Sequence, residues 1–181
     1  MSEKKWKVLE PIVSIENPWL KLVGEYLQDD QGRHLTYWSV VRPDSVLIIP
    51  IQQGQIILPS KYYRHGVQEM THDFPGGRLD PGMSREDAAE SVLQRELGLQ
   101  VADVQSLKPI NSEGWLVDSS FSSQRVYAFE GIISAAAALE PGIVDSYQPA
   151  DLSGARSILA KLVCLQCRCA LLQWMTDNLG S

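Results

Sequence analysis

The amino-acid sequence predicts an α/β protein in which a mixed sheet packs between helices, and three observations support this. Ser45–Pro50 is a continuous apolar run, typical of a central strand buried on both faces. Residues 84–98 carry apolar side chains at helical spacing, between a serine start and a glycine stop. Residues 151–178 form a second helical stretch, so helices are available for both faces of the sheet.

The first part of the chain is predicted to form a small N-terminal β subdomain. Residues 9–41 are predicted to form a run of short strands. Asn17-Pro18 and the segment Asp29–Gly32 are turn signals that separate these strands. We therefore expect residues 1–42 to form this subdomain and residues 43–181 to form the larger α/β domain with its C-terminal helix.

Within the larger domain, the central strand is predicted to form a hairpin. Gln55–Leu58 pairs with it across a turn at Gln53-Gly54, and Tyr62–Gly66 then opens a loop. Two more strands are expected near Val101–Leu107 and Gln124–Glu130.

Both helices carry recognisable ends. Ser84 and Asp87 form a capping box in front of the first helix, and Gly98 is a natural stop. Asp151 is a plausible cap for the second helix, which is predicted to run without interruption to residue 178. Its expected buried stripe consists of Leu159, Leu162, Val163, Leu171, Leu172 and Met175.

Composition restricts the class of function. The 181 residues are 44% hydrophobic and 21% charged, as in an ordinary globular protein, with a net charge of -6. The negative charge argues against nucleic acid as a partner. The N-terminus Met1–Trp6 is charged and leads into no apolar run, and no stretch reaches the roughly 18 apolar residues of a membrane helix. We expect a cytoplasmic protein without a membrane partner.

The three cysteines lie close together as Cys164, Cys167 and Cys169. The first two form a CxxC pattern, which occurs in metal and redox sites. A structural zinc site takes four ligands, however, and there is no fourth cysteine. Because the segment is also predicted to be helical, packing as small apolar residues is the favoured interpretation.

Residues 77–99 carry a specific motif. Their spacing resembles the Nudix box, G-x5-E-x7-R-E-U-x-E-E-x-G-U, in which U is apolar; Gly77, Leu93, Glu96, Gly98 and Leu99 match it. The resemblance implies the Nudix-type α/β/α sandwich and hydrolysis of a diphosphate bond. In that family, glutamates on one helical face hold Mg2+ or Mn2+ against the diphosphate.

Most of the expected glutamates are absent from this box. Met83 stands at the first glutamate position, and Val92 and Arg95 stand at two of the three metal-binding positions. The formal charge of those three positions falls from -3 in the family pattern to zero, because Arg95 cancels Glu96. We expect hydrolysis to be impaired or absent. Any residual Mg2+ or Mn2+ would rely on Glu96, a carbonyl near Gly76 and the substrate itself.

The resemblance extends to the ADP-ribose pyrophosphatase-like branch over about residues 10–175. It implies substrate-binding roles for Arg42 and Arg64, and for Asp73 in place of a glutamate. Arg95 is a further candidate for substrate binding, because guanidinium groups match phosphate oxygens. Gln124 stands where the branch has a second catalytic carboxylate, and an amide cannot act as a base. Each of the charged residues has a simpler alternative as a surface charge or a turn partner.

Three functions remain open at this stage. The first is an impaired hydrolase of ADP-ribose or another nucleoside diphosphate sugar, with catalytic Glu96 and, if active, Mg2+ or Mn2+. The second is a metal-free module that binds a nucleotide sugar through its arginines. The third is a structural or interaction protein. The resemblance also implies a homodimer in which the N-terminal β subdomain packs on the partner subunit.

Overall fold

The computed structural model describes residues 6–180 of the chain, so most of the charged segment Met1–Trp6 lies outside the described residues. The described residues form two compact units. The first unit holds residues 6–44 and Leu116–Arg125, and the second unit holds Ser45–Trp115 and residues 126–180. The sequence assigns all of residues 43–181 to one domain, whereas Leu116–Arg125 makes its contacts with the first unit.

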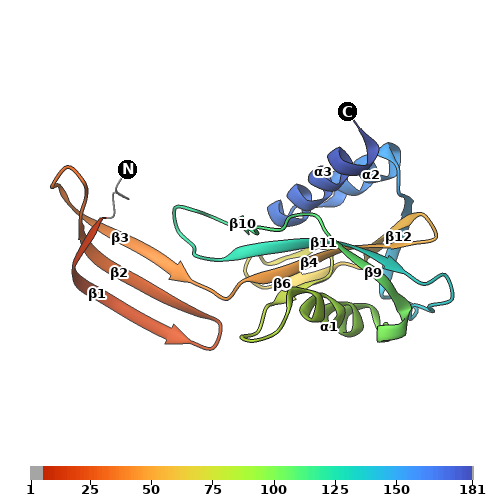
Figure 1. Cartoon of the computed structure of the whole chain (residues 1–181), viewed down its shortest axis with the longest axis horizontal. Helices are drawn as coiled ribbons and strands as arrows, with labels where there is room; N and C mark the ends of the chain where they lie inside the picture. Colours follow the sequence, from red (N-terminus) through yellow and green to blue (C-terminus); the bar gives the residue numbers. More distant parts are fainter. Residues whose placement is uncertain (1–5, 181) are drawn as a thin grey trace. The chain divides into compact units, whose positions relative to one another are not determined.

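The first unit is built on a three-stranded antiparallel sheet in the order β1–β2–β3 (Figure 1). The strands are longer than the short ones predicted: Lys7–Asn17, Leu20–Gln28 and His34–Val41. The turns lie where the sequence places them. The side chains of Asn17 and Asp29 accept backbone hydrogen bonds within the two turns, which fixes where the chain reverses.

A mixed seven-stranded sheet forms the centre of the second unit. Its main order is β10–β11–β4–β5–β12, with β8 paired to β4 and β9 paired to β11. β4 runs parallel to β11 and antiparallel to β5 and β8. The strands are β4 (Ser45–Gln52), β5 (Gln55–Pro59), β8 (Gly76–Arg78), β9 (Val104–Pro109), β10 (Trp115–Leu116), β11 (Arg125–Ile133) and β12 (Val144–Pro149).

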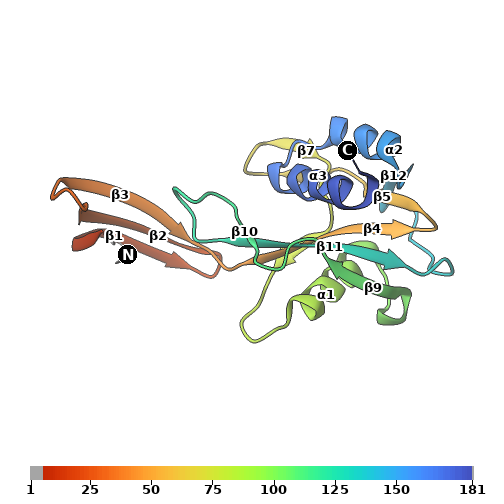
Figure 2. The same cartoon turned by 45° about the horizontal axis from the view of Figure 1, so that its top comes forward.

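Helices cover both faces of this sheet, as the sequence predicts. α1 (Arg85–Leu97) lies on one face, and α2 (Leu152–Lys161) and α3 (Leu165–Leu179) lie on the other (Figure 2). A short 3-10 turn, Val101–Asp103, precedes β9. Among the described residues, every helix falls short of the length and hydrophobicity that a bilayer span requires.

The core confirms the central strand and the hairpin. All residues from Val46 to Ile51 are buried, as expected for a strand covered on both faces. β4 and β5 reverse at Gln53 and Gly54, which both have positive φ. The loop expected after β5 instead contains a separate two-stranded hairpin of β6 (Tyr62–Arg64) and β7 (Glu69–Thr71).

The prediction of one uninterrupted C-terminal helix is wrong, because this segment forms two helices, α2 and α3. Asp151 caps α2 by accepting a hydrogen bond from the Gly154 N–H at 2.8 Å, as expected. The chain then leaves the helix after Lys161 and restarts at Leu165. The Arg168 guanidinium fills the gap by donating to two terminal carbonyls of α2, those of Leu159 and Leu162, at 2.6 and 2.9 Å.

The break changes which side chains of the C-terminal segment are buried. Val163 and Leu172, predicted to be in the buried stripe, are 66% and 49% exposed. Leu162 and Leu171 are buried as predicted. The two helices also bury residues outside the predicted stripe: Ala155 and Ile158 in α2, and Cys167, Ala170 and Trp174 in α3.

Candidate functional site

Helix α1 has the ends that the sequence predicts. The Ser84 hydroxyl accepts a hydrogen bond from the Asp87 N–H at 3.0 Å, and Gly98 closes the helix in the left-handed conformation, with φ of 69°. One side of the helix packs into the core. Val92 belongs to that side and is only 2% exposed, so it presents two methyl groups where a metal ligand is expected from the resemblance.

A close approach between β8 and α1 requires the glycine at the first position of the box. A Cβ atom on Gly77 would lie 2.7 Å from the Val92 Cγ2 atom and 2.9 Å from the Arg95 Nη2 atom. Contacts this short would force one of these groups to move. The β8 backbone therefore lies directly against Val92 and Arg95.

The Arg95 guanidinium connects the two groups that remain from the expected metal site. Its Nη2 atom donates to the Gly76 carbonyl at 3.3 Å and to the Glu96 Oε1 atom at 2.9 Å. The other Glu96 oxygen, Oε2, accepts from the Gly76 N–H at 3.3 Å. A fixed positive charge thus lies between a carboxylate and a carbonyl that could otherwise serve a metal ion. We refer to Gly76, Val92, Arg95 and Glu96 as the box face.

The donor set of the box face does not fit an Mg2+ or Mn2+ ion of the kind that the resemblance implies. Such ions take several oxygen ligands, with carboxylates prominent among them. Here one carboxylate is present, and it already pairs with a guanidinium. A divalent cation would also be repelled by Arg95 at close range.

Arg64 and Asp73, predicted as separate substrate contacts, bind each other. The Arg64 Nε and Nη2 atoms both lie 2.8 Å from the Asp73 Oδ2 atom. The guanidinium also lies 3.8 Å over the centre of the Tyr62 ring. Asp73 is buried, and the Thr71 hydroxyl donates to the same Oδ2 atom at 3.0 Å.

Arg42 and Gln124 belong to the first unit, where they lie on neighbouring segments. The Arg42 N–H donates to the Ser123 hydroxyl at 3.3 Å, and Val40 forms a bridge with Ser122. Arg42 is exposed, whereas Gln124 is 6% exposed. Arg42 and Gln124 thus belong to one unit, and the other unit holds the pair of Arg64 and Asp73 and the box face.

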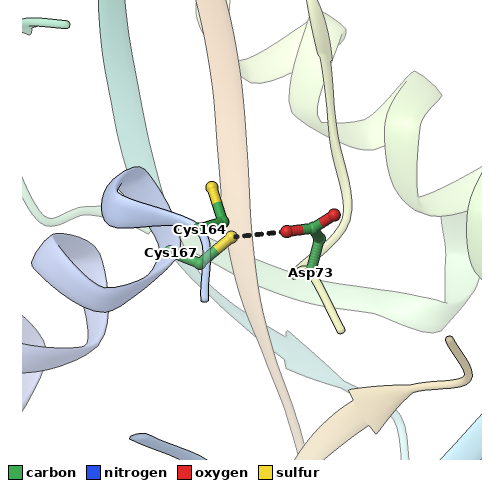
Figure 3. Close-up of side chains that lie close together, drawn as sticks. All are labelled: Asp73, Cys164 and Cys167. Carbon is green, nitrogen blue, oxygen red and sulfur yellow. Dashed lines mark hydrogen bonds between the residues drawn. The ribbon is translucent and has the colours of Figure 1, made fainter. Parts of the chain in front are cut away.

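A second group of chemically active side chains lies at the start of α3. Cys164 is the N-cap residue of this helix, and Cys167 lies buried in its first turn. Cys167 donates to the Asp73 Oδ1 atom at 3.9 Å (Figure 3). Its sulfur also accepts from the Phe74 N–H at 3.4 Å. Its hydrogen bond to Cys164 lowers the pKa of the Cys164 thiol to about 6 and raises the pKa of Cys167.

Sequence reasoning did not find this group, because it treated residues 151–178 as one helix. In an unbroken helix both cysteines would be interior positions with no special partner. The break after Lys161 places Cys164 at a helix start, and Asp73 comes from a segment about 90 residues earlier. The CxxC pattern was the one available signal.

Comparison with known proteins supports the fold. No protein-family model matches the chain. Over 75 residues it is 35% identical to proteins named RNA pyrophosphohydrolase from Pectobacterium carotovorum and Pectobacterium atrosepticum. The match covers 41% of this chain and 38% of each relative's length.

A solved structure matches the whole chain. The crystal structure of an ADP compounds hydrolase aligns with a TM-score of 0.77 and 18% identity, over 100% of both chains. The chain has the Nudix-type α/β fold. The Nudix-type fold is therefore confirmed independently of the box residues.

Proposed function

We propose that this chain is a Nudix-superfamily protein that binds a small diphosphate compound of the nucleoside diphosphate sugar class and hydrolyses it weakly or not at all. The fold it shares with an ADP compounds hydrolase supports the ligand class, and the local identity to pyrophosphohydrolases supports the superfamily. The net charge of -6 favours a small ligand over an RNA end, since RNA binders normally present a basic face.

The observation that carries the proposal is the position of the Arg95 guanidinium. It bonds to Gly76 and Glu96, so the positive charge at the box face comes from the protein chain itself. The Arg95 side chain is 56% exposed, and its Nε and Nη1 atoms make no hydrogen bond with the described residues. Those donors are available to phosphate oxygens, which guanidinium groups bind well.

This arrangement favours binding over hydrolysis. Cleavage of a diphosphate needs a base or an activated water as well as charge neutralisation. Glu96 is the remaining box glutamate, and its two oxygens are occupied by Arg95 and by the Gly76 N–H. The site can hold a diphosphate without being equipped to cleave it.

Two measurements on ADP-ribose test this function. Calorimetric titration in the absence of divalent metal should show binding, and Arg95→Gln should weaken it by about tenfold, corresponding to the loss of one charged hydrogen bond. Turnover with Mg2+ or Mn2+ should stay well below about 1 s⁻¹, the low end of ordinary enzyme rates. Metal-dependent turnover at or above that rate, abolished by Glu96→Gln, would overturn the proposal, as would the absence of binding at millimolar ligand.

A second role, as a homodimer, is favoured by the surface of the first unit. Its edge strand β1 leaves large apolar side chains in solvent, among them Val8 at 52% and Ile15 at 54% exposed, and Trp19 follows at 72%. An edge strand with exposed apolar residues is a typical place for another chain to pack. Light scattering should give twice the 20.2 kDa chain mass, and a monomer would contradict this.

A further inference from the structure

Three potential metal ligands from distant parts of the sequence meet in the second unit. Asp73 comes from the segment between β7 and β8, and Cys164 and Cys167 come from the start of α3. Their ligand atoms all lie within 4.8 Å of one another. Among the residues that the structure describes, this is the one group of three or more histidine, cysteine or acidic side chains at such spacing. We refer to these three residues as the cysteine cluster.

The carboxylate of the cluster is held in place by one of its oxygens. Asp73 Oδ2 accepts hydrogen bonds from Arg64 and Thr71, and Oδ1 is left facing the Cys167 sulfur (Figure 3). Metal-binding carboxylates are commonly oriented by outer hydrogen bonds of this kind. The cluster therefore already contains the support that a ligand carboxylate requires.

The two sulfurs are also placed to act as thiolate ligands. The Phe74 N–H points at the Cys167 sulfur at 3.4 Å, and such a donor stabilises negative charge on sulfur. Cys164 lies at the N-terminus of the 15-residue helix α3, where the helix dipole favours an anion. Cys164 is partly exposed, which provides a route for an ion to enter.

The charge of the cysteine cluster and the distances between its ligand atoms suit a divalent ion that binds thiolates. Two thiolates and one carboxylate carry a charge of -3, which a divalent ion reduces to -1, and Arg64 lies beside Asp73 to balance the remainder. In a tetrahedral zinc site, a thiolate sulfur and a carboxylate oxygen are about 3.5 Å apart, as follows from the usual Zn–S and Zn–O lengths. The 3.9 Å between Cys167 and Asp73 needs only a small contraction.

We propose that Asp73, Cys164 and Cys167 bind Zn2+ through three protein ligands, with a fourth position left for solvent or an external ligand. Thiolate ligands select zinc over Mg2+ and Mn2+, which prefer oxygen donors. Three protein ligands and an open position are typical of zinc sites that interact with other molecules. The site shares no residue with the box face, where the diphosphate is proposed to bind.

Cobalt substitution tests the site directly. The full chain is reduced, stripped of metal and titrated with Co2+, whose bond to thiolate gives a near-ultraviolet charge-transfer band. We expect saturation at one ion per chain and displacement by Zn2+. Cys164→Ser and Cys167→Ser should each weaken binding more than about 100-fold, beyond the effect typical of outer partners. Thr71→Val should weaken it about tenfold by removing one of the hydrogen bonds that orient Asp73.

Cys169 provides a matched control. It lies on the same helix, two residues beyond Cys167, but it is exposed and outside the cluster. Cys169→Ser should leave the band and the affinity unchanged, and circular dichroism should show that all four variants fold. A reduced wild-type chain without the band would overturn the proposal. So would a band that survives both cluster substitutions, or a Cys164–Cys167 disulfide in a chain that binds no metal after reduction.

Discussion

The box face and the cysteine cluster lie in the same unit but are built in opposite ways. At the box face one carboxylate remains, and Arg95 lies against it at 2.9 Å. At the cysteine cluster three potential anions converge, and the nearby cation, Arg64, stays on the far oxygen of Asp73. A guanidinium between ligands disfavours a metal ion, whereas one behind a ligand orients it and balances its charge.

This difference shows why the fold alone does not locate a metal site. In this chain β8 and α1 lie together although two of the three expected carboxylates are absent, since Gly77 leaves room for their close approach. Whether the box face or the cysteine cluster binds a metal ion depends on a few side chains at each site. Changes at those side chains should therefore move metal binding without changing the fold.

The largest expected effect comes from restoring carboxylates to the box face. The double variant Val92→Glu/Arg95→Glu should bind Mn2+ about 100-fold more tightly than the wild type, a gain of ~2.7 kcal/mol. Electron paramagnetic resonance of free Mn2+ measures this. Arg95→Gln is the control, because it removes the guanidinium without adding a ligand, and it should gain about tenfold at most. A folded double variant with unchanged affinity would show that Arg95 does not set the preference.

The effect of metal ions on the free energy of unfolding should distinguish the cysteine cluster from the box face in the wild-type chain. Zn2+ at 100 times its Kd should raise the free energy of unfolding by about 2.7 kcal/mol, because the folded chain alone holds the complete site. The same excess of Mg2+ over the chain should have no effect. Urea unfolding measures both, and Cys167→Ser should remove the zinc effect. Equal stabilisation by Zn2+ and Mg2+ would contradict the claim that the cysteine cluster binds a metal ion and the box face does not.

Gly77→Ala should disturb the box face and leave the cluster intact. The new Cβ would meet Val92 and Arg95, and overpacking of this kind costs about 1–3 kcal/mol. Binding of ADP-ribose should weaken, and Co2+ binding should not change. Gly66→Ala is the matched control, because a Cβ there meets nothing within 4 Å and its φ is not positive. A loss of Co2+ binding in Gly77→Ala would mean that the two places are coupled.

The smallest expected effect concerns the ion pair between Lys161 and Asp145. The Lys161 ammonium, 3.0 Å from Asp145, lowers the pKa of that carboxyl from its ordinary value of 3.8, and His72 lies 3.4 Å away. The resulting stability is present above pH 3.8 and is lost as the pH falls through the lower folded pKa.

Replacing the Asp145 carboxyl tests the contribution of this ion pair to stability. Asp145→Asn should reduce the difference in unfolding free energy between pH 7 and pH 3 by less than about 1 kcal/mol, since the pair is partly exposed. Urea unfolding at the two pH values measures it. An identical difference in the variant and the wild type would show that the pair contributes nothing.

The sequence predicts the local features of the fold well. The apolar run of β4, the turn at Gln53-Gly54 and both ends of α1 are confirmed. Each of them depends on residues close together in the chain, where turn, cap and periodicity rules apply. The motif spacing also led to the Nudix-type fold that the structural comparison supports.

The features that the sequence missed depend on distant partners. The apolar periodicity in the sequence continues through residues 162–164, so it does not mark the helix break. The break is stabilised by Arg168, which donates to carbonyls at the end of α2, and this contact is visible only in the folded chain. Arg64 and Asp73 appear as two independent charges until β6 and β7 pair and bring them together. The cysteine cluster could not be predicted for both reasons, because it requires the break between α2 and α3 and also a residue, Asp73, from a distant segment.

One crystallographic measurement tests the central contrast between the two places most directly. Crystals of the reduced chain are soaked separately in Zn2+ and in Mn2+, and anomalous scattering locates each ion. We expect a Zn2+ peak between Asp73, Cys164 and Cys167, and no Mn2+ peak beside Glu96. A Mn2+ ion bound by Glu96 and the Gly76 carbonyl, or a cysteine cluster without zinc, would contradict this account.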